Sequence, residues 1–382
     1  MTSVMGDLSI NLTEEQGMLL DVARGFVADK APIEAVRAQL ETVTGFDETV
    51  WQDMVALGWT GIALPESAGG AAMGVGSVVP VIESLGSGLL GTPLISTTLA
   101  GQLLVRAGGP QGGSEGGATL DALLSRIAGG EIATVALLDN GDWGATNTAL
   151  ALTDNGTLQG RKMMVPDAGI ASIYVVVCHL GNAPALAVVE RASLAESAIT
   201  ENTLIDLTKR SANVDFTGVK PLATLTGSQV VSALRDFGLL GALLVSAEAT
   251  GSTARCLNVI VDYLKTRKQF GKLIGSYQAL KHPTVDIYCG MEDARSFVYH
   301  AATLVGDEPL SVDAEVACRM AKAQATEVLT FAGDRSVQFH GGIGFTWDCD
   351  STLFIRRAQW TRQAFSDAGH HRKHLGQLLL DS

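Results

Sequence analysis

Two segments of the chain carry the residue types that bind a phosphate-bearing cofactor. The first, residues 267–282, reads RKQFGKLIGS and continues into YQALKH, and the second, residues 338–345, reads QFHGGIGF. An arginine offers a planar fork of donors that suits a pyrophosphate. A glycine has no Cβ, so the backbone can approach a phosphate closely. The pair therefore predicts a dinucleotide site, and the alternative is that the glycines only turn the chain between two helices.

The ordered pair, with helical sequence on both sides, resembles the FAD site of the acyl-CoA dehydrogenase family. By this resemblance the flavin-contacting positions fall on Arg267, Gln269, Phe270, Ile274, Gln278, Gln338, Gly341 and Gly342. In the family the matching arginine reaches a flavin held mainly by a neighbouring subunit. The resemblance therefore implies FAD as cofactor and a homo- or heterotetramer.

The reaction implied by the resemblance is α,β-dehydrogenation of an acyl-CoA thioester, with electrons passed to an electron-transfer flavoprotein. A carboxylate takes the proton α to the thioester carbonyl, and the flavin accepts the β-hydride. Such a base works best in an apolar pocket, where burial raises its pKa. The sequence must therefore supply a carboxylate close to the flavin.

At both positions where the family places this base, the chain lacks a carboxylate. The family's last motif, Arg-Asp-Ala followed by Glu-Gly-Thr, matches residues 356–367, and Phe365 stands at the glutamate position. Other members carry the base on the first long helix of the bundle, and counting back from Arg267 puts Gly241 there. The catalytic base is thus unknown, and Gly241 predicts spare room that suits a wide substrate or none.

Other carboxylates lie near these positions. Asp367 is two residues past Phe365 and is the candidate base, although it could equally cap a helix or contact His371. Asp236 and Glu248 flank Gly241, and we interpret both as solvated or capping groups.

The β-domain signature of the family, Thr-Glu-Pro-x-x-Gly-Ser-Asp, is not recognisable in residues 137–145. The following segment, residues 159–165, does resemble the family's next β segment. Met164 and Pro166 then occupy positions where an aromatic residue and a threonine commonly face the flavin.

Four hypotheses stay open. The chain is an acyl-CoA dehydrogenase with an unorthodox base, or a subunit that helps to hold FAD but has no base of its own. The second kind resembles heteromeric enzymes that act on bulky steroid-side-chain thioesters. The third hypothesis is a flavin oxidase or monooxygenase on the same scaffold, and the fourth is a flavin-free assembly protein.

The elements that would position these residues change in type along the chain. Thr13 to Gln16 form a capping box before an apolar helical stripe, and short apolar runs from residue 131 onward suit strands. Long helical stretches follow at 228–266, 277–305, 312–340 and from 351. We expect an N-terminal helical domain (1–130), a middle β-domain of barrel or sandwich type (131–222) and a C-terminal four-helix bundle (223–382) that carries the FAD motifs. The fold class is mainly α with a central β-domain, as in acyl-CoA dehydrogenases.

Composition narrows the function further. The 382 residues are 47% hydrophobic and carry a formal charge of -13, which argues against a nucleic-acid partner. Five cysteines without a Cys-x-x-Cys pair predict reduced thiols, and neither they nor the histidines near the C-terminus indicate a metal site. The longest apolar run, residues 237–247, is too short to span a bilayer, so a cytoplasmic protein without a membrane span is expected.

Overall fold

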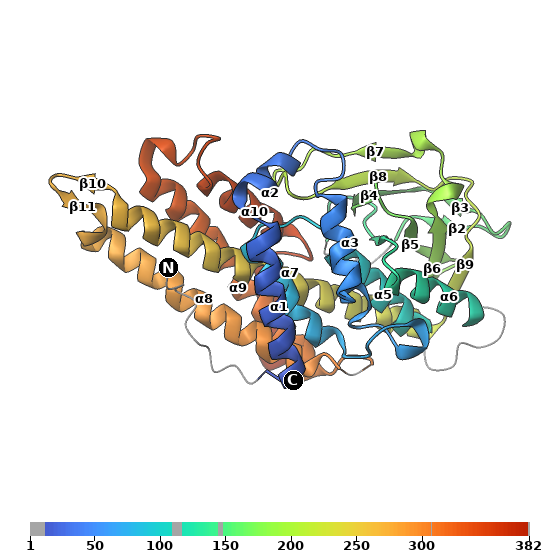
Figure 1. Ribbon diagram of the computed structural model, residues 1–382. Coiled ribbons are helices and arrows are strands. Elements are labelled where there is room, and N and C mark those ends of the chain that lie inside the picture. The colour runs from blue at the N-terminus through green and yellow to red at the C-terminus, as the bar shows by residue number, and fades with distance from the viewer. Residues whose placement is uncertain (1–11, 109–116, 144–147, 307, 381–382) are drawn as a thin grey trace.

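The computed structural model describes residues 12–108, 117–143, 148–306 and 308–380. N-terminal helices lie across the middle of the molecule, strands gather at one end, and long C-terminal helices extend to the other end (Figure 1). The expected fold class, mainly helical with a central β region, is confirmed.

The N-terminal region is helical. Its helices are α1 (Glu14–Lys30), α2 (Ile33–Gln39), α3 (Glu48–Ala56), α4 (Val79–Ser87), α5 (Leu94–Gly108) and α6 (Gly117–Ala128), with short 3₁₀ helices at Trp59–Gly61, Glu66–Ala68 and Val75–Val78. The predicted capping box is confirmed, since Thr13 Oγ1 accepts from the Gln16 N–H and the Gln16 side chain accepts from the Thr13 N–H, both at 3.2 Å.

The β region consists of two sheets. The larger sheet contains β1 (Ala133–Ala136), β2 (Ala151–Leu152), β3 (Leu158–Gln159), β5 (Ile173–Leu180), β6 (Ala183–Glu190) and β9 (Ala223–Thr226). The smaller sheet has the order β4 (Arg161–Pro166), β8 (Ser211–Asp215), β7 (Ile199–Glu201). β1 and β2 pair with β5 in parallel, and the other pairs are antiparallel.

Strand β5 is buried on both faces, which explains its uninterrupted apolar sequence. Tyr174 and Val176 pack with residues of the smaller sheet such as Val214. Ile173 and Val175 belong instead to the cluster formed by the N-terminal and C-terminal helices. One face of β5 therefore packs into the core of the β region, and the other face packs against the helices.

The C-terminal helices are α7 (Ser228–Thr266), α8 (Gln278–Leu304), α9 (Val312–His340), α10 (Ser351–Gln363) and α11 (Ala368–Leu380). A hairpin of β10 (Lys268–Gln269) and β11 (Lys272–Leu273) connects α7 to α8. The predicted limits of α7 and α9 are confirmed. The single segment expected after residue 351 is instead two helices, separated by a turn at residues 364–367.

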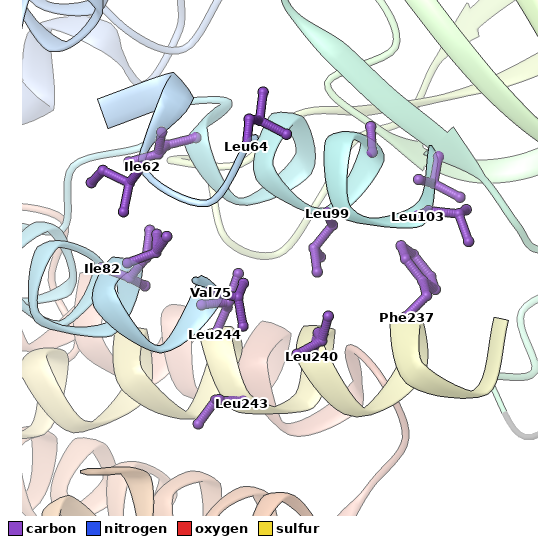
Figure 2. Close-up of a cluster of buried hydrophobic side chains, with 14 of the residues drawn as sticks. Ile62, Leu64, Val75, Ile82, Leu99, Leu103, Phe237, Leu240, Leu243 and Leu244 are labelled. Carbon is purple, nitrogen blue, oxygen red and sulfur yellow. The ribbon is translucent and has the colours of Figure 1, made fainter. Parts of the chain in front are cut away.

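Helix α7 forms the centre of the molecule. It is long and apolar enough to cross a membrane, but 72% of its most apolar window is buried inside the protein. Leu240 and Leu244 of α7 face Ile82 and Leu99 of the N-terminal helices (Figure 2). At the crossing with α4, a Cβ on Gly251 would lie 1.8 Å from the Glu83 carbonyl oxygen, so only glycine allows this approach.

Candidate active site

The first candidate site is a groove beside the β10–β11 hairpin. The hairpin lies at the far end of the C-terminal helices (Figure 1). Six of the eight residues assigned to flavin contact line it, namely Arg267, Gln269, Phe270, Ile274, Gly341 and Gly342. Gln278 and Gln338 are exposed and do not line this groove. Phe270 is 90% exposed, so the hairpin presents its ring to the solvent at the edge of the groove.

The floor of the groove is an ordered ring pair. The His340 ring stacks on Tyr263, with the centroids 4.1 Å apart, and its Nδ1 lies 2.7 Å from the Ser336 carbonyl oxygen. Gly341 follows with a φ of 65°, and a Cβ added there or at Gly342 would meet no atom within 4 Å. These glycines therefore border open space, as a site for an approaching phosphate requires. His340 lies within the second motif but was not among the residues assigned to flavin contact.

The second candidate site is an apolar pocket between the β region and the helices. Its walls come from α5, β1, β4, α7 and the end of α10, and two of the wall residues, Leu99 and Phe237, are drawn in Figure 2. Met163, Met164 and Pro166 line the same pocket from β4. That Met164 and Pro166 face the flavin stays a prediction, and it is supported by their place in the wall of one pocket.

The two positions at which the family carries its base meet in this pocket. A Cβ added to Gly241 would lie 2.1 Å from Cε1 of Phe365, so the phenyl ring occupies the space above the glycine. The ring also packs against Trp143 and Phe237, at centroid distances of 4.7 and 5.6 Å. The prediction that Gly241 leaves spare room is wrong, because the side chain at the other position fills it.

A strained turn holds the Phe365 ring in place. Phe365 and Ser366 both have positive φ, 56° and 73°, which is unfavourable for residues other than glycine. Nζ of Lys322 donates to the carbonyl oxygens of Thr361 at 3.0 Å and Ser366 at 2.7 Å. Nε2 of His371 donates to the Phe365 carbonyl oxygen at 2.8 Å. Two buried side chains therefore fix the turn.

Burial controls the charge of both of these side chains. It lowers the pKa of Lys322 to about 7, with Asp367 opposing the shift. It also lowers the pKa of His371 to about 3, against the hydrogen bond to Phe365. His371 is thus neutral at pH 7, with its proton on the Nε2 that donates to Phe365.

Asp367 lies outside the apolar pocket. Its Oδ1 accepts from the backbone N–H of His370 at 2.8 Å, which caps the start of α11, and its side chain faces a different surface hollow. The hydrogen bond from His370 lowers the pKa of Asp367. The catalytic base is expected to be buried in an apolar pocket with a raised pKa. Asp367 is exposed, caps a helix and has a lowered pKa, so it does not meet that expectation.

The carboxylates that flank Gly241 are not solvated as expected. Asp236 is buried and pairs with Arg106 at 2.7 Å. Glu248 is buried and its Oε1 lies 2.5 Å from Lys209 Nζ and 3.0 Å from an Arg357 nitrogen. The interpretation of both as solvated or capping groups is wrong, because both are buried in ion pairs whose partners come from elements far away in the sequence.

Sequence reasoning missed Asp167, which also lines the apolar pocket. Its Oδ2 accepts from Ser96 Oγ at 2.5 Å, and burial raises its pKa, opposed by that hydrogen bond and by Lys209. The signal was present, since Asp167 directly follows Pro166, a residue already expected to face the flavin.

Two family models match the chain: the N-terminal domain of acyl-CoA dehydrogenases over residues 13–112 and the C-terminal domain over residues 239–365. The protein "Acyl-CoA dehydrogenase IpdE2" of Mycobacterium tuberculosis is 30% identical over 357 residues, covering 92% of each chain. Its namesake in Mycolicibacterium smegmatis is 29% identical and covers 92% of this chain and 94% of its own length.

Solved structures share the fold over nearly the whole chain. The ChsE4–ChsE5 complex from Mycobacterium tuberculosis includes a chain that is 26% identical, with a TM-score of 0.83 over 98% of this chain and all of its own. A steroid acyl-CoA dehydrogenase, Tcur3481–Tcur3483, includes one that is 25% identical, with a TM-score of 0.82 over 96% of this chain and 98% of its own.

Proposed function

The chain belongs to the acyl-CoA dehydrogenase family of FAD-dependent oxidoreductases, and we propose that it is an FAD-binding subunit without a catalytic base of its own. One observation carries the proposal. The ring of Phe365 fills the space above Gly241, so the two positions that supply the base in other family members are in contact and neither carries a carboxylate. A partner chain of the same family then supplies the carboxylate.

The groove residues fit the diphosphate half of FAD. Arg267 offers paired donors to the phosphates, and Gly341 and Gly342 let backbone approach them without a Cβ in the way. The exposed Phe270 ring beside them offers an apolar face. FAD, when bound, supplies the acceptor for the β-hydride of the thioester.

A second chain is needed to complete such a site. The groove lies beside β10 and β11, whereas the pocket that contains Phe365 lies between the β region and α10, on a different part of the molecule (Figure 1). We infer that the groove of this chain meets the flavin of a partner subunit. The proposal of a second chain is supported by two similar solved structures that are each described by two protein names, ChsE4–ChsE5 and Tcur3481–Tcur3483.

The partner's carboxylate removes the α-proton in the complex that we propose. Its substrate is an acyl-CoA thioester with a bulky acyl group, as the steroid-acting relative suggests. Electrons leave the complex through an electron-transfer flavoprotein, in line with family membership. This chain contributes cofactor binding and the scaffold that keeps water from the site.

The proposal is tested by producing the chain alone and together with a family member that carries the motif glutamate. We expect an acyl-CoA to bleach the flavin anaerobically only in the mixed complex. Turnover by this chain alone would refute the proposal. Asp167 is the strongest rival base, so Asp167→Asn should leave the turnover of the complex within a few-fold. A loss of about a thousandfold would identify Asp167 as the base.

The role of the groove is tested separately. Arg267→Ala should lower the FAD content of the mixed complex, because the phosphates lose a paired cation. Arg255→Ala is the matched control, since Arg255 is exposed on the same helix and does not line the groove. Equal FAD content in the two variants would contradict the assignment of the groove.

A further inference from the structure

The apolar pocket has polar groups within one part of its wall. Ser96, Asp167, Lys209 and Glu248 line it together with the apolar residues. Ser96 Oγ donates to Asp167 Oδ2 at 2.5 Å, and Lys209 Nζ donates to Glu248 Oε1 at 2.5 Å. Ser96 lies on α5, Asp167 directly follows β4, Lys209 lies in the loop before β8, and Glu248 lies on α7. The fold therefore assembles the four side chains from four segments.

The Glu248 carboxylate has one satisfied oxygen and one that is not. Oε1 lies beside both Lys209 and Arg357, at 2.5 and 3.0 Å. Oε2 is buried and, within the described residues, has no hydrogen-bond partner in the protein. The side chain is only 4% exposed, so bulk water does not solvate it. A buried charged oxygen without a partner is costly, and it therefore indicates a group that enters the pocket.

The chemistry of that group follows from its neighbours. A carboxylate oxygen only accepts, so the entering group must donate a hydrogen bond. An ammonium would be repelled by Lys209, and a second carboxylate would be repelled by Glu248. A hydroxyl is neutral, donates to Glu248 Oε2 and can accept from Lys209 Nζ at the same time.

We propose that this pocket binds an apolar molecule that carries a hydroxyl group, with the hydroxyl donating to Glu248 Oε2 beside the Lys209–Glu248 ion pair. Most of the rest of the wall is apolar and includes Leu99, Val135 and Val245, and its other polar members are Thr92, Thr134 and Arg210. The body of the ligand is therefore hydrocarbon, either the acyl group of a CoA thioester or a free lipid alcohol. The inference goes beyond the proposed function, because binding here requires neither a base nor turnover.

Direct binding tests the proposal with probes of matched shape. Trp143 and Trp360 line the pocket, so their fluorescence reports occupancy. The probes are decahydronaphthol and decahydronaphthalene, which differ by one hydroxyl. We expect the purified protein to bind the alcohol about tenfold tighter or more, as for a buried hydrogen bond to a charged group. Equal affinities would overturn the proposal and show that water satisfies Glu248.

A variant pair isolates the carboxylate. Glu248→Gln keeps the shape and removes the charge, and we expect it to erase most of the preference for the alcohol. Glu315→Gln is the matched control, because Glu315, like Glu248, pairs with two cationic side chains, here Arg235 and Arg319, but does not line the pocket. An unchanged preference in Glu248→Gln overturns the proposal. If that variant does not fold, the ratio of the two affinities in the native chain still decides.

Two further measurements separate the possible sources and a rival. Tighter binding of a hydroxyacyl-CoA than of the free alcohol assigns the ligand to the thioester, and equal binding assigns it to a free lipid. The flavin ring is the rival partner for Glu248. If Glu248→Gln shifts the absorption spectrum of bound FAD, and loading with FAD abolishes alcohol binding, the flavin satisfies Oε2 and the proposal fails.

Discussion

Replacing Gly241 with alanine tests whether the Phe365 ring fills the space above Gly241, as the structure shows. The new Cβ would lie 2.1 Å from Cε1 and 2.4 Å from Cδ1 and Cζ of the ring, whereas ordinary contact begins near 3.4 Å. The ring must move by more than 1 Å or so, and Trp143 and Phe237 pack against it. We therefore expect a steric penalty rather than a tolerated change.

The magnitude follows from two opposing terms. Overpacking of this kind costs about 1–3 kcal/mol. Replacing glycine by alanine within a helix contributes about 1 kcal/mol in the other direction. The native chain should thus lose up to about 2 kcal/mol of unfolding free energy on Gly241→Ala. In a Phe365→Ala background the ring is absent, and the same change should stabilise by about 1 kcal/mol.

The diagnostic result is that Gly241→Ala lowers the free energy of unfolding in the native chain and raises it in the Phe365→Ala background. Urea unfolding of the four proteins, followed by tryptophan fluorescence and circular dichroism together, gives the coupling energy, which we expect at about 1–3 kcal/mol. Gly238→Ala is the matched control, since a Cβ on Gly238, one turn earlier in α7, meets no atom within 4 Å. It should stabilise equally in both backgrounds. Additive effects of Gly241→Ala and Phe365→Ala would refute the contact.

Three further predictions concern the turn that holds Phe365. The folded-state pKa of Lys322 lies at about 7, below its ordinary value of 10.5. Between these two pH values the unfolded chain binds the lysine proton more readily than the folded chain does. The free energy of unfolding therefore rises with pH across that window. Lys322→Met should lose this rise, which urea midpoints at pH 7 and about pH 9.5 measure; an unchanged rise would mean that another group causes it. Ser366→Gly should raise the free energy of unfolding by up to about 1 kcal/mol, because the residue has a φ of 73°, and a loss of stability would show that the turn is not strained there. Asp367→Ala should cost about 1 kcal/mol of stability through loss of the α11 cap, while turnover of the mixed complex stays within a few-fold; a large loss of turnover would contradict the capping role.

Local patterns explain which parts of the fold the sequence could predict. The capping box at Thr13 and the limits of α7 and α9 depend on residues close together in the chain, so apolar periodicity and end signals were enough. The break between α10 and α11 was not predicted, although Asp367, which caps α11, had been named as a possible helix cap. Phe365 and Ser366 adopt positive φ under tertiary constraint from Lys322 and His371, which no local signal announces.

In the candidate site, too, residues with a local sequence signal were predicted and residues brought together only by folding were missed. Arg267 and the glycines near Gly341 were found because they form a recognisable linear motif. The polar wall of the pocket was missed because Ser96, Asp167 and Lys209 stand alone in their own segments. Only folding brings them beside Glu248, a residue that its own helix gave no reason to regard as buried.

The departures from the family pattern are compensated, and this bears on what the chain does. Phe365 replaces a glutamate, and Gly241 leaves the space that its ring occupies. Arg357 stands where the family's last motif has an aspartate, and it is fully buried with Asp206 at 2.5 Å and Glu248 at 3.0 Å.

Each replacement alone would be damaging. A large ring forced into a filled site costs about 1–3 kcal/mol, and an unpaired buried charge costs about 3–5 kcal/mol. A chain that was merely losing function would carry such defects uncorrected. Here each defect has its partner in place, so the fold is kept intact around a pocket whose two usual base positions carry no carboxylate. That is the pattern expected of a subunit whose role is to bind and to scaffold while another chain performs the proton transfer.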